Sequence, residues 1–240
     1  MPEDSAPSPK IFISGVSKSF GAFRALANCS LRVGKGEVLA LIGPNGAGKT
    51  TLIKILTGLL EPTSGCAALA GHDIQADPIG AKRTFGYVPD DPTVYDYLTG
   101  REFLALTGRL RGLSRSQITE RTTDLLGLFP VKHLMDEQMG NYSRGNKQKV
   151  AFLAALLPKP DMLLIDEPIV GLDPESITIL GKTIREFAKN GGTVLFTTHI
   201  LSFAKDYADA YALMVGGKIV RKGRITTQTT LDGEYKKAVQ

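Results

Sequence analysis

Residues 43–51 read Gly43-Pro44-Asn45-Gly46-Ala47-Gly48-Lys49-Thr50-Thr51, and they directly follow the apolar run Val38–Ile42. The spacing matches the pattern G-x-x-x-x-G-K-[ST] between a strand and a helix. A loop with three glycines can turn its backbone N–H groups around a phosphate chain. The helix that follows, expected at 49–58, points its positive end at the same anion. The sequence therefore predicts a phosphate-binding loop.

Two side chains of this loop are candidates for direct contact with a nucleotide. Lys49 is expected to reach the β- and γ-phosphates, and the Thr50 hydroxyl is expected to hold Mg²⁺. The alternative is a glycine-rich turn that matches by accident. The strand before the loop and the helix after it argue against that alternative.

The composition fits one large domain, or one domain with an inserted lobe: the chain has 240 residues, and 42% of them are hydrophobic. The net charge of +5 is scattered, without the basic stripe that would indicate a nucleic-acid partner. Cys29 and Cys66 lack metal-ligand spacing and are expected to be buried small hydrophobes in a reducing compartment. The longest apolar run, 150–157, is far shorter than the about 20 residues of a membrane span. Any work on a membrane is therefore expected to go through another chain.

Strand and helix patterns alternate along the chain and predict a mostly parallel, three-layer sheet. Alternating residues at Ile11–Phe20 and 27–33 predict an antiparallel sheet near the N-terminus. Further strands are expected at Val38–Ile42, 66–70, 84–88, Met162–Ile165 and 193–197, helices at 175–189 and Leu201–Tyr207, and a closing hairpin at 214–220.

Residues 91–157 change to helical periodicity, with helices expected at Gly100–Leu110, 116–126 and 144–157. We therefore expect a flexible tail at 1–9 and a single domain at 10–240. Within that domain, a core of 10–90 and 158–240 would carry an inserted helical lobe of 91–157.

Two carboxylates, Asp166 and Glu167, end the predicted strand Met162–Ile165. The carboxyl edge of an open α/β sheet is where ligands bind. Side chains alternate along a strand, so one carboxylate is expected to join a Mg²⁺ shell and the other to reach an attacking water. Pro168 is expected to keep Glu167 extended. The alternative is a strand end that happens to be acidic.

Two further side chains have a structural and a functional interpretation. His199 follows the apolar run 194–198, so its N–H is expected at the same sheet edge, near the γ-phosphate or the water. A lone histidine at a strand end is otherwise structural. Phe20 is either a core aromatic or a flat surface on which adenine stacks.

Residues 141–148 read Asn141-Tyr142-Ser143-Arg144-Gly145-Asn146-Lys147-Gln148. Ser143 is a plausible N-cap for the helix that follows. A helix N-terminus with exposed N–H groups is also an anion site. Because this helix lies in the inserted lobe, it could face the phosphate loop of a second copy of the chain.

From about residue 10 to residue 223, the chain resembles the nucleotide-binding subunit of an ABC transporter. The matching segments are 43–51 (Walker A), 85–89 (the strand before the Q-loop), 142–146 (the LSGGQ signature), 163–167 (Walker B), 170–173 (the D-loop), His199 (the switch histidine) and Phe20 (the stacking aromatic). This resemblance implies an α/β fold: a P-loop NTPase three-layer core, an N-terminal antiparallel β subdomain and an inserted α-helical subdomain.

The resemblance also implies ATP hydrolysis by a head-to-tail dimer, with each ATP between one subunit's Walker motifs and the other's signature helix. Glu167 would activate water, and Lys49 and His199 would bind the γ-phosphate. Asp166 and Thr50 would hold Mg²⁺. The remaining residues implied at the nucleotide are Ser143 and Gly145, contributed by the second subunit, together with Asn146 and Asp173.

Two departures from the family pattern stand out. Asp90 replaces the Q-loop glutamine; aspartate is charged and only accepts hydrogen bonds, but it could still ligate Mg²⁺. In the signature, Arg144 replaces the first glycine and Asn146 replaces the glutamine. We expect Arg144 to point to solvent, because the positive end of a helix disfavours a cation. The alternative is a cation near the γ-phosphate.

The resulting hypothesis is an ATP-hydrolysing subunit that powers transport, with export favoured, through a separate membrane-spanning permease. It would be a homodimer or heterodimer on the cytoplasmic face of the membrane, touching the membrane only indirectly, with residues 90–99 docking the permease. Segments 87–92 and 142–149 resemble the bacterial drug, antibiotic and Ecs-type export branch. The alternatives are a soluble non-transport ABC ATPase, a P-loop phosphotransferase and a catalytically silent regulatory subunit.

Overall fold

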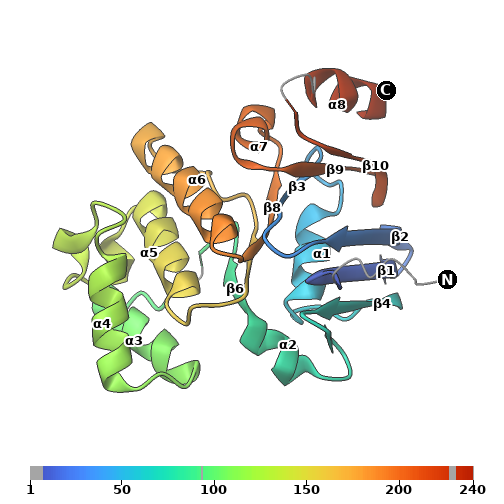
Figure 1. Cartoon of the computed structure of the whole chain (residues 1–240). Coiled ribbons are helices and arrows are strands. Elements are labelled where there is room, and N and C mark those ends of the chain that lie inside the picture. The colour runs from blue at the N-terminus through green and yellow to red at the C-terminus, as the bar shows by residue number, and fades with distance from the viewer. Residues whose placement is uncertain (1–7, 93, 227–230, 240) are drawn as a thin grey trace.

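The computed structural model describes residues 8–92, 94–226 and 231–239. Most of the tail expected at 1–9 lies outside the described residues. A six-stranded sheet in the order β10-β9-β3-β8-β7-β6 forms the centre of the molecule (Figure 1). Its parallel strands are β3 (Val38–Ile42), β6 (Phe85–Val88), β7 (Met162–Ile165), β8 (Thr193–Thr198) and β9 (Ala210–Val215), and β10 (Lys218–Arg224) pairs antiparallel with β9.

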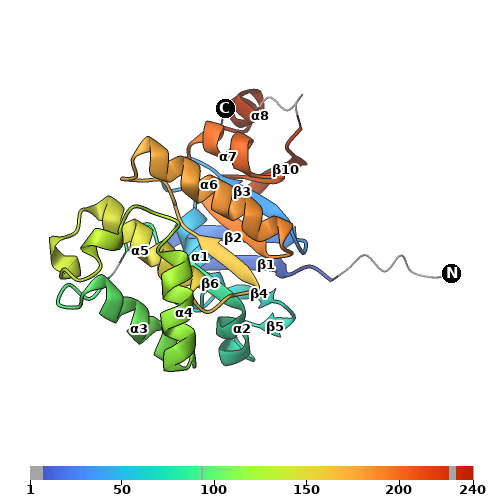
Figure 2. The same cartoon turned by 60° about the vertical axis from the view of Figure 1, so that its left-hand side comes forward.

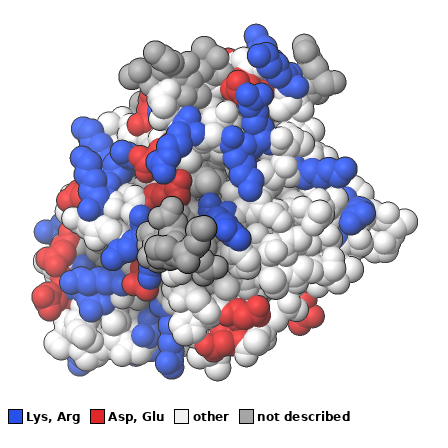
Figure 3. Space-filling view, turned by 45° about the vertical axis from the view of Figure 1, so that its right-hand side comes forward, with Lys and Arg blue, Asp and Glu red and all other residues white. Residues whose placement is uncertain are grey.

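An antiparallel sheet in the order β2-β1-β4-β5 forms the second β-layer, as the alternating N-terminal pattern predicted. Its strands are β1 (Ile11–Phe20), β2 (Phe23–Val33), β4 (Ser64–Leu69) and β5 (His72–Asp73). Helix α1 (Lys49–Leu56) contacts β2 and β4. On the face shown in Figure 3, basic and acidic side chains are interspersed among uncharged surface.

Further helices cover the face of the central sheet opposite to α1 (Figure 2). Helix α6 (Pro174–Lys189) packs on β3 and β8, α7 (Leu201–Tyr207) packs on the same two strands, and α8 (Leu231–Val239) packs on β9. None of the helices among the described residues is long and apolar enough to cross a bilayer. The arrangement of the two sheets and of these helices confirms the predicted three-layer α/β fold class.

Three helices between β6 and β7 pack on one another: α3 (Gly100–Leu110), α4 (Arg115–Leu125) and α5 (Arg144–Leu156). Short 3₁₀ turns at Lys132–Leu134 and Met139–Asn141 precede α5. Helix α5 also contacts β6, and so it joins this helical region to the central sheet. All three helices lie within two residues of the expected bounds.

Two elements near residue 80 were not predicted. Strand β5 has two residues and α2 (Pro78–Thr84) has seven, so neither contains enough repeats for a periodic pattern. The helix is marked instead by local chemistry. Asp77 caps it by accepting a hydrogen bond from the Gly80 N–H, and Pro78 occupies its first turn.

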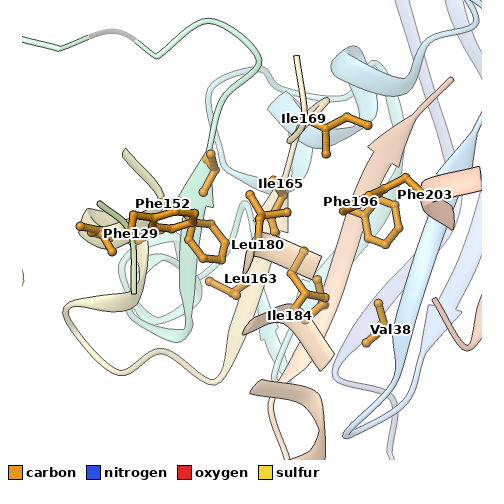
Figure 4. Packing of buried hydrophobic residues seen from close by; sticks show 14 of the residues in the cluster. Val38, Phe129, Phe152, Leu163, Ile165, Ile169, Leu180, Ile184, Phe196 and Phe203 are labelled. Atoms are coloured by element: carbon orange, nitrogen blue, oxygen red, sulfur yellow. The ribbon is translucent and has the colours of Figure 1, made fainter. Parts of the chain in front are cut away.

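The central strands are buried on both faces, which explains their continuous apolar sequences. Along β3, Leu39 and Leu41 pack into the cluster around α1, whereas Val38, Ala40 and Ile42 face the cluster around α6. The second cluster extends without a break into the helical region, where Phe152 of α5 meets Phe129 (Figure 4). One continuous core therefore joins α5 to the strands that carry the candidate site.

Candidate functional site

Strands β3, β8 and β7 are consecutive neighbours in the sheet, and the candidate residues follow their carboxyl ends. Lys49 lies just beyond β3, His199 follows β8, and Asp166 and Glu167 follow β7. Because the three strands run in parallel, their ends meet at one edge. The sheet order therefore brings together groups that are more than one hundred residues apart in the sequence.

The phosphate loop needs glycine for two physical reasons. Gly46 and Gly48 have φ angles of 79° and 104°, in the region that favours glycine. A Cβ on Gly43 would lie 2.3 Å from the carbonyl oxygen of Met214 in the neighbouring β9. The Lys49 ammonium folds back along the loop and donates to the carbonyl oxygen of Gly43 at 2.7 Å.

Glu167 is held by contacts from the phosphate loop after β3 and from the end of β8. Its Oε1 lies 3.2 Å from Lys49 Nζ and its Oε2 lies 2.9 Å from His199 Nδ1. Its backbone N–H donates to Thr197 Oγ1 at 2.9 Å. With only 7% of the residue exposed, the carboxylate is buried between a lysine and a histidine.

The expected extended geometry of Glu167 is wrong. Its φ is +46°, a left-handed value that is rare for a residue with a side chain. Pro168 disfavours the right-handed helical region for the residue before it, but it does not by itself select the extended one. The hydrogen bond to Thr197 and the ion pair with Lys49 fix the turn instead.

Asp166 is a buried carboxylate with an unused oxygen. Its Oδ1 accepts a hydrogen bond from Thr197 Oγ1 at 2.5 Å, whereas its Oδ2 is buried with no hydrogen-bond partner among the residues that the structure describes. Burial raises the pKa of this carboxyl, the hydroxyls of Thr197 and Thr50 oppose the rise, and the charges of Asp90 and Glu167 add to it. Such an oxygen is suited to a cation.

These residues fit Mg²⁺ bound together with a nucleotide. The described residues contain no group of three or more His, Cys, Asp or Glu that could hold a metal by itself. Mg²⁺ in nucleotide sites, however, keeps waters and takes one or two carboxylates along with phosphate oxygens. The unused oxygen of Asp166, with Thr50 and Asp90 beside it, matches that donor set.

A pocket of about 250 Å³ opens over the phosphate loop. Its lining residues are Phe23, Ala25, Asn45, Gly46, Ala47, Gly48, Lys49, Thr50, Thr51, Asp90 and Glu167. Phe23, which is 65% exposed, was not predicted from the sequence. Phe20 is not among the lining residues; its ring lies 5.2 Å from Lys18 Nζ. Phe20 and Phe23 are cross-strand partners at the tip of the β1–β2 hairpin. This pairing of two aromatics is the feature that could have identified Phe23.

The predicted cap of α5 is confirmed: Ser143 Oγ accepts a hydrogen bond from the Asn146 N–H at 3.2 Å. Neither Ser143, Gly145 nor Asn146 is among the described residues that line the phosphate-loop pocket. A Cβ on Gly145 would lie 2.4 Å from the carbonyl oxygen of Gly171, so the helix start packs tightly against the segment after Glu167.

Asp173 caps α6 instead of lining the pocket. Its carboxylate accepts hydrogen bonds from the Ser176 N–H at 2.8 Å and from Lys149 Nζ at 2.9 Å. The bond from Lys149, helped by Ser176, holds the pKa of this carboxyl well below its usual range. Asp173 therefore links the segment after Glu167 to α5.

Arg144 is exposed to solvent, as expected, but its guanidinium also makes a contact that was not expected. Its Nη2 lies 3.1 Å from Asp90 Oδ1 and donates to the Asp90 carbonyl oxygen at 3.2 Å. The helix end does disfavour a cation, but a carboxylate and a carbonyl oxygen on the facing segment offset that repulsion.

Replacement of Asp166 by Asn tests the buried charge. With a raised pKa in the folded chain, the ionised carboxylate destabilises the protein at neutral pH, and this cost disappears as the pH falls through the folded pKa. Without nucleotide or Mg²⁺, Asp166→Asn should therefore raise the unfolding free energy at pH 7, on the order of 1 kcal/mol. This gain should shrink toward about pH 4, the usual range of an aspartate. Urea unfolding across that range measures it, and a gain that grows on acidification would contradict the assignment.

Comparison with known proteins agrees with this geometry. Residues 26–170 match the family model described as "ABC transporter". Over 89% of its length the chain is 38% identical to the uncharacterized ABC transporter ATP-binding protein YxlF of Bacillus subtilis, covering 70% of that protein. It is 36% identical, again over 89% of its length, to the doxorubicin resistance ATP-binding protein DrrA of Mycobacterium tuberculosis, covering 65% of that protein.

A solved structure titled "Structure of ATP binding subunit of ABC transporter" superposes with a TM-score of 0.89 at 33% identity, over 95% of this chain and 98% of that one. The resemblance inferred from the motifs is therefore confirmed at the level of sequence and fold. The chain belongs to the ABC transporter family, as an ATP-binding subunit that hydrolyses ATP to power transport through a separate membrane subunit.

Proposed function

We propose that ATP is hydrolysed at the edge formed by β3, β8 and β7, with Glu167 as the group that activates the attacking water. The observation that carries this assignment is the contact chain from Lys49 through Glu167 to His199. Lys49 sits in the loop that would hold the phosphates, so a carboxylate in contact with it lies beside the γ-phosphate. His199 would orient Glu167, and its other ring nitrogen would reach the same phosphate.

The backbone N–H groups of residues 43–51 would hold the phosphate chain. We propose that adenine stacks at the tip of the β1–β2 hairpin, where Phe23 lines the pocket and Phe20 lies opposite it. Stacking needs a flat apolar face and no charge, which this pair supplies.

Thr50, Asp166 and Asp90 would hold Mg²⁺, and the ion would supply positive charge next to the phosphate oxygens. The buried Oδ2 of Asp166 supports this assignment most directly. Thr197 keeps the other oxygen of Asp166 occupied and accepts the Glu167 N–H, so one hydroxyl orients both carboxylates.

We propose that Ser143, Gly145 and Asn146 of one copy complete the site of another, with Asp173 at the same interface. Subunits of this family dimerise and pair with transmembrane subunits. Ser143 is exposed at the positive end of α5 and lies outside its own phosphate-loop pocket, which leaves that helix end available to a second molecule. The second molecule is a copy of this chain or a related subunit.

The division into a core of 10–90 and 158–240 and a helical lobe of 91–157 remains our proposal. The similarity to a protein named for doxorubicin resistance favours export. Through its permease, the chain would lie on the cytoplasmic face of the membrane. A phosphotransferase is disfavoured, because ATP-binding subunits of this family hydrolyse ATP and Glu167 would activate water as the acceptor.

Replacement of Glu167 by Gln tests the assigned base. The amide keeps the size of the side chain but cannot accept the proton, so we expect ATP turnover to fall by at least about 100-fold while ATP still binds. Phosphate release by the purified chain and ATP binding by equilibrium dialysis give the two numbers. The unaltered chain should release phosphate without any acceptor molecule. Turnover within three-fold of the parent would remove Glu167 from this role.

A groove of about 820 Å³ lies between α2 and the C-terminal end of α3, where the core meets the helical region. Exposed Leu59, Ile79 and Leu110 line it, and Lys82 and Arg83 belong to its wall. We propose that this groove receives an apolar segment of the permease with acidic flanks. The segment 90–99, where docking was expected, also exposes Tyr95 and Tyr97.

Substitutions that introduce one negative charge distinguish docking at the groove from docking at 90–99. Ile79→Asp and Leu110→Asp should each shift most of the chain from the membrane fraction to the supernatant in cells that make the permease, because they place a carboxylate against an apolar segment. ATP turnover of the purified variants serves as the control. If Tyr97→Asp releases the chain and the groove variants do not, docking belongs to 90–99.

A further inference from the structure

Two of the three positions at which this chain departs from the family pattern, Asp90 and Arg144, contact each other. They are 54 residues apart in sequence, and Arg144 Nη2 reaches both Oδ1 and the backbone oxygen of Asp90. One partner follows β6 of the central sheet, and the other is the first residue of α5. The contact therefore crosses from the nucleotide-binding core to the helix that begins the signature segment.

Asp90 also belongs to the nucleotide pocket. It lines that pocket together with the phosphate loop and Glu167, and its charge contributes to the raised pKa of Asp166. A single carboxylate thus lies within reach of two cations: the guanidinium of Arg144 and a divalent ion bound beside Asp166. Because Arg144 engages Oδ1 and the backbone oxygen of Asp90, a divalent ion would have to share the carboxylate or draw it away from Arg144.

We infer that Arg144 is a positioning residue that holds the Asp90 carboxylate toward α5 and competes with Mg²⁺ for it. Binding of the metal–nucleotide complex and attachment of the start of α5 to the core then oppose each other. This inference rests on the Mg²⁺ site proposed above. It gives Asp90 and Arg144 a shared role, as the two partners of one ion pair.

The exposure of the pair makes such competition feasible. The Arg144 and Asp90 side chains are 48% and 45% exposed, so the ion pair is screened by water and weak. A hard divalent cation with a phosphate beside it is a stronger partner for a carboxylate. A fully buried pair could not exchange partners in this way, because the abandoned guanidinium would be left without solvent.

Neighbouring contacts keep α5 in place when Asp90 leaves Arg144 for Mg²⁺. Lys147 Nζ lies 2.9 Å from Asp96 Oδ1, and Gln148 Nε2 donates to the Pro89 carbonyl oxygen at 3.3 Å. Gln148 is buried, and the cluster around Phe152 anchors the same helix. Release of Arg144 therefore removes one contact at the first turn of α5, next to Ser143 and Gly145, and leaves the rest of the helix in place.

The test measures the affinity for a nonhydrolysable ATP analogue in excess Mg²⁺ and in excess EDTA, using the full chain and calorimetry. The informative quantity is the ratio of the dissociation constant in EDTA to that in Mg²⁺. Arg144→Ala and Arg144→Gln should raise this ratio by about three- to five-fold, because the carboxylate is no longer engaged. Arg144→Lys, which keeps the charge, should stay nearer the parent value. Lys147→Ala is the matched control and should leave the ratio unchanged.

The Asp90→Ala variant and the Asp90→Ala/Arg144→Ala double variant show whether the effect passes through Asp90. The two should have the same ratio, below that of the parent chain. If the parent shows no Mg²⁺ dependence, the metal site itself is wrong. If the parent depends on Mg²⁺ but Arg144→Ala does not raise the ratio, or raises it equally without Asp90, the competition between Arg144 and Mg²⁺ is overturned.

Discussion

The buried ion pair between Lys49 and Glu167 is the interaction on which the rest of the site depends. It joins the phosphate loop after β3 to the carboxylates after β7 across the intervening strand β8. A buried charge is tolerated only beside a partner, so each of these two residues needs the other in place. Strand β8 completes the arrangement, because Thr197 and His199 supply the hydrogen bonds that orient Asp166 and Glu167.

This arrangement follows from the order of the strands. Parallel strands that are neighbours in a sheet end at the same edge, so any polar group placed just after β3, β8 or β7 faces the same region. The continuous core beneath them, from Val38 to Phe203 and into α5, fixes those ends relative to one another (Figure 4). The candidate site and the helical region are therefore joined through the contacts between α5 and β6.

The sequence predicted the parts of this site that depend on local pattern. The phosphate loop, the strand ends that carry Asp166 and His199, and the Ser143 cap each have a short signature with a physical cause. The left-handed turn at Glu167 could not be predicted, because a hydrogen bond from β8 selects it. The contact between Arg144 and Asp90 was missed for a similar reason: helix-end electrostatics were considered for one helix alone, without the segment that faces it. Phe23 was missed because the hairpin register, and not the residue type, places it at the pocket.

The central claim is that nucleotide binds between the phosphate loop of one molecule and the start of α5 in another. Disulfide cross-linking tests it most directly, with Asn45→Cys in one preparation and Ser143→Cys in a second. Both also carry Glu167→Gln to retain ATP. Both carry Cys66→Ser as well, because Cys66 is exposed and not buried as the sequence had suggested. The account predicts a covalent dimer only when the two preparations are mixed, and only with ATP and Mg²⁺. Absence of that dimer from the mixture, or an equal yield from either preparation alone, would contradict it.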